Sequence, residues 1–480
     1  RITATANGLV PVSISEVALL VSQPATIDIA FTQVGGVTET VSVLAETPLI
    51  NAVDASLGIA VGTRPILQLP FEARNVVALL SLQPGVAYIR DTPSPADDTR
   101  NGAVNGGKSD QANITLDGVD VNDQQNGFAF TSVLRMTLDS VQEFRTTTLN
   151  AGAEEGRASG AQVTLVTKGG TNDFHGSLYE YHRNTKTSAN SFFNNAVPAT
   201  PDNPRGGIER QKLIRNVFGG SFGGPVKKNR LFFFFNYEGR RDASEESVVR
   251  TVPSETMREG IVRYLRTDGS VATLTPDVLR TRIDPAGIGV SPAVLDFLRL
   301  YPMPNDDTTG DGLNTRGFRF KSPIRTRLNT YITKWDWYAD PSGRHQFFFR
   351  GNYQDDSSTD VEQFPGTGVR WTTLNNTKGL AAGYNYGFTR QGVEQAGGQN
   401  SSYIVIRGIS QLYPDTPSLT RIVPVHTFRD DVSWSSGRHQ LKFGGVVRVI
   451  NNNRTNFNRS WHLGTVNASW LRLSGAELNT

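Results

Sequence analysis

The sequence contains no cysteine and only three methionines among its 480 residues. Without cysteine, neither a disulfide framework nor a cysteine-ligated zinc site can form. No apolar run approaches the roughly 18 residues that a membrane-spanning helix requires. Residence in a membrane would therefore have to use the strands of a closed barrel, since these also satisfy their backbone hydrogen bonds in lipid.

A strong excess of charge of either sign is missing as well. The chain carries 48 lysines and arginines against 45 acidic residues, a net charge of +3. The basic residues are scattered among acids, which does not indicate a nucleic-acid partner. The chain starts at Arg1 without a methionine or a signal peptide and ends within a strand pattern at Thr480. We therefore expect it to be a piece of a longer or processed protein.

Glycine and aromatic residues are abundant, with 47 glycines and 25 phenylalanines. This composition favours strands and long loops over helices. From residue 171 onward, apolar and polar side chains alternate in segments such as 346–354, 380–389 and 441–449. Segments of about ten residues with this alternation are typical of a transmembrane barrel strand, which has lipid on one side and the lumen on the other. A soluble β-sandwich is the alternative, but it does not need such long loops.

The first 170 residues have a different pattern. Residues 1–36 contain two or three short strands, which are too few to bury a core and indicate the end of a larger β-sandwich. Residues 37–170 are predicted to be a compact α+β segment. Its expected elements are a strand at 37–46, a helix at 74–82, a hairpin at 113–121, a short helix or helical turn at 138–144 and a strand at 161–168.

The turns after residue 171 fall into two classes. The string SGRHQ occurs at 342–346 and again at 436–440, each time between two predicted strands, and a third hairpin joins 216–222 to 231–237. Long excursions at 184–211 and 241–325 alternate with these tight turns, and the second contains possible surface helices at 255–265 and 292–300. Short periplasmic turns and long outer loops give this asymmetry in an outer-membrane barrel.

Two catalytic patterns occur in the wrong context. Residues 102–109, GAVNGGKS, match the phosphate-loop pattern, but a polar stretch precedes them and a strand rather than a helix follows. Residues 219–223, GGSFG, match the nucleophile-elbow pattern, but they run into Pro225 and another strand. We interpret both as glycine-rich segments without catalytic chemistry.

Two groups of residues contain side chains that could bind a metal. His175 and His182, with Glu180 between them, would face opposite sides of a strand because their spacing is odd. Asp306, Asp307, Asp311 and Asn314 carry the oxygen ligands that calcium prefers, but their spacing is not that of an EF-hand, and an acidic surface turn is the favoured interpretation.

Several motifs together resemble one known family. They are NGGKSDQ at 105–111, LDGVD at 116–120, VQEF at 141–144, EGRASGA at 155–161, VTKGGTN at 166–172 and FHGSLYE at 174–180. These segments resemble the plug and the plug-to-barrel junction of TonB-dependent outer-membrane receptors, and most of all the Oar-like branch. FGGSFGGP at 218–225, LFFFF at 231–235 and YEG at 237–239 are similar to the early barrel hairpin of that branch.

The resemblance implies a mainly β fold in three parts. Residues 1–36 resemble the closing strands of an immunoglobulin-like carboxypeptidase regulatory-like domain. Residues 37–170 would form a small α+β plug, and residues 171–480 the N-terminal portion of an incomplete transmembrane antiparallel β-barrel with long extracellular loops. The family's barrel has 22 strands around its plug, so this chain would hold the opening strands.

The resemblance also implies a function and a location. It predicts a receptor in the outer membrane, in contact with lipid, for energised uptake of a scarce or bulky ligand such as an iron chelate, a glycan or a peptide. A TonB-type inner-membrane complex would be the partner, although we find no TonB box. No bond would be made or broken, and no cofactor, catalytic residue, metal or nucleic acid is expected. The alternative is an adhesion protein that uses the barrel as an anchor.

The polar plug loops at 101–111 and 120–127 are the predicted ligand-binding region. Their candidate residues are Asn101, Asn105, Lys108, Asp110, Gln111, Asp120, Asn122 and Asp123. The segment 152–183 is the predicted joint: 161–167 would be the last plug strand, 169–173 the crossing, and 174–183 the first membrane strand. Because this joint is short and covalent, force-driven opening would start from the N-terminal side of the plug, near Val37.

Overall fold

The structure is a computed structural model. It describes residues 2–14, 29–31, 41–43, 56–68, 74, 76–87, 103–107, 111–122, 132, 134–152, 155–156, 160–190, 192–196, 198–199, 204, 206–207, 209–339, 346–369, 372–382, 384–392, 403–406, 410, 419–436, 439–456 and 463–466. The account below concerns these residues.

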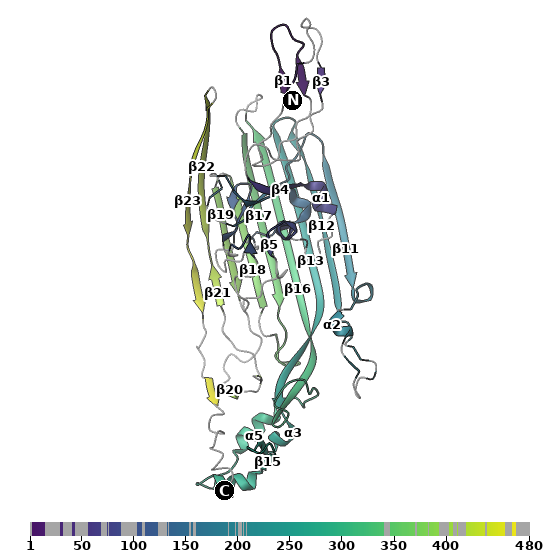
Figure 1. The fold of residues 1–480 in the computed structure, drawn as a ribbon, viewed down its shortest axis with the longest axis vertical. Helices are drawn as coiled ribbons and strands as arrows, with labels where there is room; N and C mark the ends of the chain where they lie inside the picture. The colour runs from purple at the N-terminus through teal and green to yellow at the C-terminus, as the bar shows by residue number, and fades with distance from the viewer. Residues whose placement is uncertain are drawn as a thin grey trace.

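A small three-stranded sheet comes first in the chain. It consists of β1 (Ile2–Ala4), β2 (Val12–Ile14) and β3 (Val41–Val43), and it lies at one end of the molecule in Figure 1. β2 pairs antiparallel with β1 and parallel with β3. The strand expected at 37–46 therefore exists as β3 but belongs to this sheet. The predicted boundary at residue 37, like the other domain boundaries, stays a prediction.

A five-stranded sheet with short helices forms the compact unit that we call the plug. Its strand order is β4 (Leu57–Gly62), β9 (Val141–Leu149), β10 (Gln162–Thr167), β7 (Asn113–Leu116) and β8 (Val119–Asp120). Around it lie α1 (Thr63–Gln68), the 3₁₀ helices η1 (Val76–Leu82) and η3 (Leu138–Ser140), and the short hairpin of β5 (Val86–Ala87) and β6 (Ala103–Val104). The predicted hairpin at 113–121 is confirmed, because β7 and β8 pair antiparallel.

The apolar residues of these plug elements share one core. Val76 and Leu80 of η1 pack with Ile114 of β7, Phe144 of β9 and Leu165 of β10, and all five are almost completely buried. One expected element is wrong in part: residues 138–144 form η3 and the start of β9 rather than a single helical turn. The apolar spacing of three residues reflects a buried turn followed by a strand, which periodicity over so short a segment does not separate from a helix.

An eleven-stranded sheet, which we call the wall, makes up most of the molecule. Its strands are β11 (His175–Asn184), β12 (Leu213–Lys227), β13 (Leu231–Pro253), β16 (Thr315–Tyr338), β17 (Gln346–Thr359), β18 (Thr372–Ala381), β19 (Tyr384–Gly392), β21 (Leu419–Ile422), β22 (Val425–Ser436), β23 (His439–Ile450) and β24 (Asn453–Asn456). All their pairings are antiparallel. Figure 1 shows the plug lying against this curved sheet.

The remaining elements lie between wall strands. They are η4 (Thr185–Thr187), α2 (Phe192–Asn195), α3 (Glu255–Arg258), β14 (Val262–Leu265), β15 (Val271–Leu274), α4 (Pro276–Val278), the π-helical turn η5 (Leu279–Ile283), α5 (Pro292–Arg299), β20 (Tyr403–Ile406) and β25 (Leu463–Val466). The expected surface helix at 292–300 is confirmed as α5. The one expected at 255–265 is wrong beyond its first turn, because residues 262–265 pair with β15 as a hairpin.

The wall strands alternate as the sequence predicts. On β17, Phe347, Phe349 and Tyr353 are exposed, whereas Arg350 and Gln354, at positions of the opposite parity, are buried and contact the plug. On β23, Phe443 and Val447 are exposed while Arg448 points inward to an ion pair with the plug. Within the described part of the chain, no helix is long and apolar enough to cross a membrane.

Aromatic rings line the exposed face of the wall in two rows. Tyr237, Tyr331 and Tyr353 form one row, with ring centroids 4.8 and 5.8 Å apart. Trp337 and Phe347 stack at 5.3 Å in the other. Tyr331 and Trp337 are six residues apart on β16, or roughly 20 Å at about 3.4 Å per residue. This spacing is close to the ~25 Å apolar band, flanked by aromatic girdles, of outer-membrane barrels.

The two ends of the wall differ in their connections. At one end, which we call the short-turn end, few residues separate consecutive strands: three between β12 and β13, and two each between β18 and β19 and between β22 and β23. Long connections at 185–212 and 254–314 leave from the opposite, long-loop end. In barrels of this kind the short turns are periplasmic and the long loops extracellular. β13 and β16 continue past the tyrosine row toward the long-loop end, as the twisted ribbon in Figure 1 shows.

A second apolar core lies at the tip of this ribbon. Phe364, from the connection between β17 and β18, is almost fully buried and meets the ring of Tyr301 edge-on at 5.8 Å. It also packs on Phe318 and Phe320 of β16, with centroids 6.2 and 6.4 Å away. Leu298 of α5 completes the cluster. The connection between β17 and β18 therefore packs, through Phe364, against the connection 254–314. We call residues 254–314 with Phe364 the loop subdomain.

Replacing the ring at the centre of this cluster should loosen the loop subdomain without affecting the wall. We expect Phe364→Ala to destabilise it locally by about 3–5 kcal/mol, the usual range for deleting a buried aromatic ring. Limited proteolysis of the protein in its membrane should then cut within 254–314 much faster. Met303→Ala, at a side chain that is 53% exposed, is the matched control, and equal cleavage of the two variants would contradict the assignment.

Two carboxylates make the loop subdomain sensitive to acid. Although burial raises the pKa of Asp311, hydrogen bonds from the backbone amides of 313–315 outweigh it and lower the pKa below 3.8. Burial likewise raises the pKa of Asp306. Hydrogen bonds from Thr308 and the ion pair with Arg319 have the larger effect, so the pKa of Asp306 is also below its ordinary value. Their stabilisation is thus present above the ordinary pKa and is lost as pH falls through the lowered one.

We therefore expect residues 306–315 to lose protection below about pH 3.8, the ordinary pKa. Hydrogen exchange measured by mass spectrometry, corrected for the intrinsic rate at each pH, would show this. In Asp311→Asn the protection should be low already at neutral pH and should change less with acid. Undiminished protection of the wild-type segment down to pH 2.5 would contradict the prediction.

Candidate functional site at the plug–wall interface

The turn between β7 and β8 carries the most buried ion pair across the interface. Asp117 and Gly118 have φ values of 48° and 80°, the left-handed conformation of a two-residue hairpin turn. The Asp117 carboxylate lies 2.9 Å from Nε of Arg350 on β17 and 3.5 Å from Nζ of Lys334 on β16. It also accepts a hydrogen bond from the Thr167 hydroxyl at 2.7 Å. One plug carboxylate thus holds two neighbouring wall strands.

Because this contact is buried, the Arg350 guanidinium needs a partner for its charge within the protein. The Arg350 side chain is 0% exposed, and its guanidinium also donates to the Leu116 carbonyl oxygen at 3.2 Å. A buried guanidinium is tolerated when a carboxylate and hydrogen-bond acceptors surround it, and removing its partner is strongly destabilising. The plug turn and Arg350 are therefore mutually dependent.

A second ionic contact joins the plug to β13. Arg74, just before η1, donates to Asp139 of the plug and to Glu238 of the wall, both at 2.9 Å. Tyr179 of β11 donates to the same Glu238 carboxylate at 2.8 Å, and its ring lies under the guanidinium. Burial lowers the pKa of Arg74, but Glu238 and Tyr179 outweigh it and raise the pKa above its ordinary value.

A third contact lies nearby, around Arg135. Its guanidinium binds both carboxylate oxygens of Asp356 on β17, at 2.6 and 3.0 Å, and donates to the Thr330 hydroxyl at 2.5 Å. Two residues later, the Thr137 hydroxyl donates to Oδ1 of Asn236 on β13 at 2.7 Å. Bidentate arginine–carboxylate pairs fix orientation as well as distance. These contacts therefore set how the plug is rotated against the wall.

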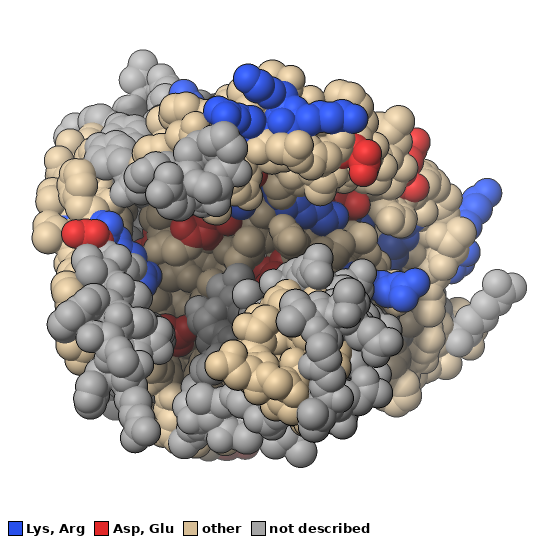
Figure 2. All heavy atoms as spheres, turned by 90° about the horizontal axis from the view of Figure 1, so that it is seen from above, with Lys and Arg blue, Asp and Glu red and all other residues tan. Residues whose placement is uncertain are grey.

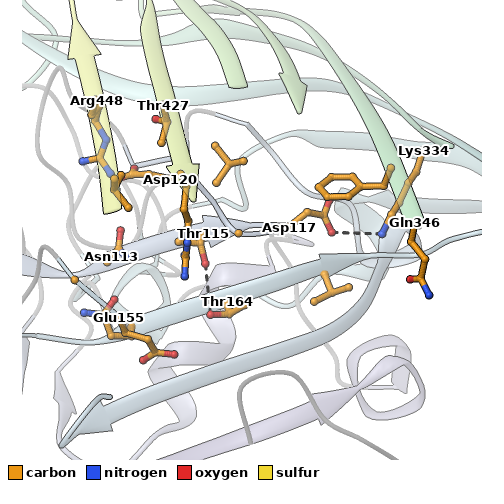
Figure 3. Close-up of a pocket in the computed structure, with 18 of the residues that line it drawn as sticks. Asn113, Thr115, Asp117, Asp120, Glu155, Thr164, Lys334, Gln346, Thr427 and Arg448 are labelled. Atoms are coloured by element: carbon orange, nitrogen blue, oxygen red, sulfur yellow. Dashed lines mark hydrogen bonds and ion pairs between the residues drawn. The ribbon is translucent and has the colours of Figure 1, made fainter. Parts of the chain in front are cut away.

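A cavity of about 880 Å³ lies between the plug and the wall (Figure 3). Plug strands β7, β8 and β10 form one side, and wall strands β16, β17, β22 and β23 form the other. Its lining includes four acidic side chains, Asp117, Asp120, Glu155 and Asp336, and three basic ones, Lys334, Arg429 and Arg448. Tyr338 and Gln346, beside the turn between β16 and β17, place the cavity toward the short-turn end. Seen from that end, Figure 2 shows charged side chains inside the hollow of the wall.

Asp120 of the plug forms an ion pair across this cavity with a wall strand late in the chain. Its carboxylate lies 2.6 Å from the guanidinium of Arg448 on β23 and also accepts a hydrogen bond from the backbone amide of Asn122 at 2.9 Å. Four plug residues, Arg74, Arg135, Asp117 and Asp120, therefore bind wall strands from β13 to β23. We call this polar interface and its cavity the seam.

The joint between plug and wall passes close to the sheet. A side chain at Gly170 would place its Cβ 2.4 Å from the carbonyl oxygen of Phe233 and 2.7 Å from that of Gly224. The strands on either side of the predicted joint have bounds close to those expected, since β10 ends at Thr167 and β11 begins at His175. Lys334 of the wall donates to the Thr167 carbonyl oxygen at 3.1 Å. The plug residue from which the covalent connection starts is therefore also part of the interface with the wall.

The predicted ligand-binding residues have different positions. Asp120 lines the cavity, as just described. Asn122 is buried and bonds to Asn113 and to the Ile114 amide, which is a structural role. Asn105 is exposed, its side chain donating to the Thr148 carbonyl oxygen, and Gln111 is exposed near Gly107. Asn101, Lys108, Asp110 and Asp123 lie outside the described residues. Ligand binding by all eight stays a prediction.

The motifs set aside on sequence context have structural roles. Residues 103–107 of the phosphate-loop match form part of a β-hairpin, and Ser221 of the nucleophile-elbow match lies inside β12, bonded to Ser177. His175 and His182 bond to separate neighbours. Asp311 caps backbone amides and Asp306 pairs with Arg319, and the described residues include no group of three or more His, Asp or Glu side chains arranged to hold a metal.

The fold and the seam define a class of protein: a β-barrel wall with a plug held against its inner face. A family model described as an outer membrane beta barrel domain matches residues 166–405, half of the chain. The chain therefore belongs to this outer-membrane β-barrel family. The predicted fold class and the outer-membrane location are confirmed.

One sequence relative supports the resemblance to TonB-dependent receptors, and solved structures are similar in fold. The chain is 28% identical over 238 residues to the TonB-dependent transporter Oar of Myxococcus xanthus, covering 48% of this chain and 19% of that protein. It superposes on the outer membrane transporter YddB from Escherichia coli with a TM-score of 0.53 at 13% identity, covering 86% of this chain and 50% of that one. The ferric citrate transporter FecA gives 0.40 at 12% identity, over 84% and 57%. The chain thus spans about a fifth of Oar and half of YddB.

The buried ion pair at the plug turn gives a direct test of the seam. We expect Asp117→Ala to leave Arg350 buried without its carboxylate, which typically costs about 3–5 kcal/mol. The plug should become digestible by protease in a folded wall, measured by digestion of purified protein that keeps its heat-modifiable mobility on gels. Asp355→Ala is the matched control, since it removes a partly exposed pair with Arg327. Equal plug digestion in both variants would contradict the assignment.

Proposed function

We propose that this chain is part of a transporter that takes up a scarce or bulky ligand across the outer membrane. In this proposal the plug blocks the barrel at rest, and a TonB-type complex of the inner membrane supplies the force that opens it. The observation that carries the proposal is the seam: the plug meets the wall through discrete polar contacts beside a cavity of about 880 Å³. No bond is made or broken in the ligand.

The composition of the seam supports a plug that can move. Among the described residues, the main plug core includes one wall side chain, Ile332, and is otherwise built from plug residues. Hydrogen bonds that open to water are replaced by bonds to water, so each contributes only about 0.5–1.5 kcal/mol net, or about 1.5–3 kcal/mol where a charged group takes part. Separating a shared apolar core would instead expose its whole surface. The plug can therefore shift against the wall while its own core stays intact.

The covalent connections suggest a direction for that movement. The plug is joined to the wall directly after β10, through 168–174, and its N-terminal side leads to the three-stranded sheet at the short-turn end (Figure 1). A pull from the periplasm would reach β4 before it reaches β10. We infer that the seam near Arg74 opens before the contact at Asp117, which lies against Thr167 at the tethered end.

A second candidate function is adhesion, with the barrel as an anchor. The loop subdomain favours it, since this unit has its own core and still exposes Ile288, Leu265 and Leu300 at its surface. Exposed apolar residues of this kind are common at protein interaction sites. The two functions make opposite demands on the plug, because adhesion does not require it to move.

A reversible link between plug and wall separates the two functions. The chain has no native cysteine, so Thr137→Cys with Asn236→Cys introduces one pair, at side chains now 2.7 Å apart. Mild oxidation would join the two buried thiols as a disulfide, and dithiothreitol would release them. The transported nutrient must first be identified. Cells lacking the gene are grown on a panel of media, each with one nutrient in limiting supply, and the nutrient on which they stop growing is chosen.

Under transport, uptake of that labelled nutrient should fall to the level of the deletion strain after linking and recover after reduction. The two single-cysteine variants are the controls and should be unaffected. Uptake should also stop when the energising complex is deleted. Undiminished uptake by the linked protein, or a deletion strain that loses cell contact but grows in every condition, would instead favour adhesion.

A further inference from the structure

A second cavity, of about 490 Å³, opens at the long-loop end between β11, β12 and β13, which we call the rim pocket. Its outer side is formed by residues 185, 188–190 and 210–212, at the two ends of the connection between β11 and β12. Several bonds hold these residues in place. Asn184 accepts hydrogen bonds from the amides of Lys186 and Thr187, and Arg210 donates to the carbonyl oxygens of Thr185 and Ser188 at 3.0 and 2.7 Å. The pocket is therefore preformed.

Positive charge is concentrated in this pocket. Its lining contains the basic side chains Arg183, Arg210, Lys212 and Arg215, against the acidic Glu245 and Glu246. Next to the pocket, the Asp242 carboxylate forms ion pairs with two guanidinium groups, that of Arg215 at 3.1 Å and that of Arg240 at 2.6 Å. Among these described residues, five cations face three carboxylates, so two positive charges are in excess.

The pocket faces the interior and not the lipid. Arg183 lies on the same face of β11 as Tyr179, whose hydroxyl bonds to Glu238 in the seam, since their spacing is even. Arg215 stands opposite Arg183 on β12, in register. Asp242 is four residues beyond Glu238 on β13, roughly 14 Å at about 3.4 Å per residue. A ligand in the rim pocket would thus lie inside the wall, between the seam and the long-loop end.

The donors match a particular chemistry. Guanidinium groups bind carboxylate and phosphate through paired hydrogen bonds. The hydroxyls of Thr185, Ser188 and Ser244 add neutral polar groups to the lining. A volume of this size fits a small ligand. We propose that the rim pocket binds a small soluble ligand with two or more carboxylate or phosphate groups, as the first binding site of the transported molecule; in this respect it rests on the proposed function.

Binding can be measured without transport, by isothermal titration calorimetry on the purified full-length protein in detergent. Citrate and pyrophosphate are the probes, one for each oxyanion, and glucose is the neutral control. We expect at least one anion to bind and glucose not to bind. The double variant Arg183→Gln with Lys212→Gln keeps the bonds from Arg210 that hold the pocket wall. It should weaken anion binding by roughly 10- to 100-fold, the effect of losing charged hydrogen bonds. Added salt should weaken it too.

Arg325→Gln is the matched control, an exposed arginine at a similar level on the outward face of β16, and its binding should be unchanged. Circular dichroism and heat-modifiable mobility confirm that each variant is folded.

Failure of both anions to bind at 1 mM, or equal binding by the double variant, would overturn the proposal. So would a loss of copurifying phosphorylated glycolipid in the double variant, which would assign the pocket to membrane lipid. Normal binding with no uptake would overturn transport alone, and normal uptake without anion binding would overturn the pocket alone.

Discussion

The two-residue period of the long wall strands is the constraint on which the rest of the structure depends. In lipid every backbone amide and carbonyl must be paired within the protein, so the strands pair along their length and their side chains alternate between two environments. Neighbouring residues therefore have different roles. Trp335 is exposed in the aromatic band, whereas Lys334 beside it points inward, to Thr167 and Asp117.

This alternation makes the seam possible and also makes it sensitive to register. A slip of one residue would exchange the two faces of a strand. On β17 such a slip would move Arg350 into lipid and Phe349 into the seam. The ion pair of Arg350 with Asp117, and that of Arg135 with Asp356, form only in the native register. We infer that these pairs contribute to specificity as well as to attachment, although a buried ion pair adds little to net stability.

Much of this architecture was predictable because it is local. Alternation identified the wall strands, the Asp117–Gly118 turn identified the plug hairpin, and glycines identified the joint near Gly170. The errors also have local causes. Residues 138–144 have a spacing that suits a helical turn and a buried strand equally, and the segment 255–265 has few residues with which to separate a helix from a hairpin.

The seam itself was not predictable from periodicity or motifs. Arg74 binds Glu238 from 164 residues away, and Arg135 binds Asp356 from 221 residues away. Arginine and glutamate are common, and nothing local distinguishes these from the solvated charges around them. By itself the sequence determined which face of each strand meets lipid, because that depends on neighbours two residues apart. The tertiary structure alone decided which inward charges meet, because their pairing depends on how the plug is placed against a wall formed later in the chain.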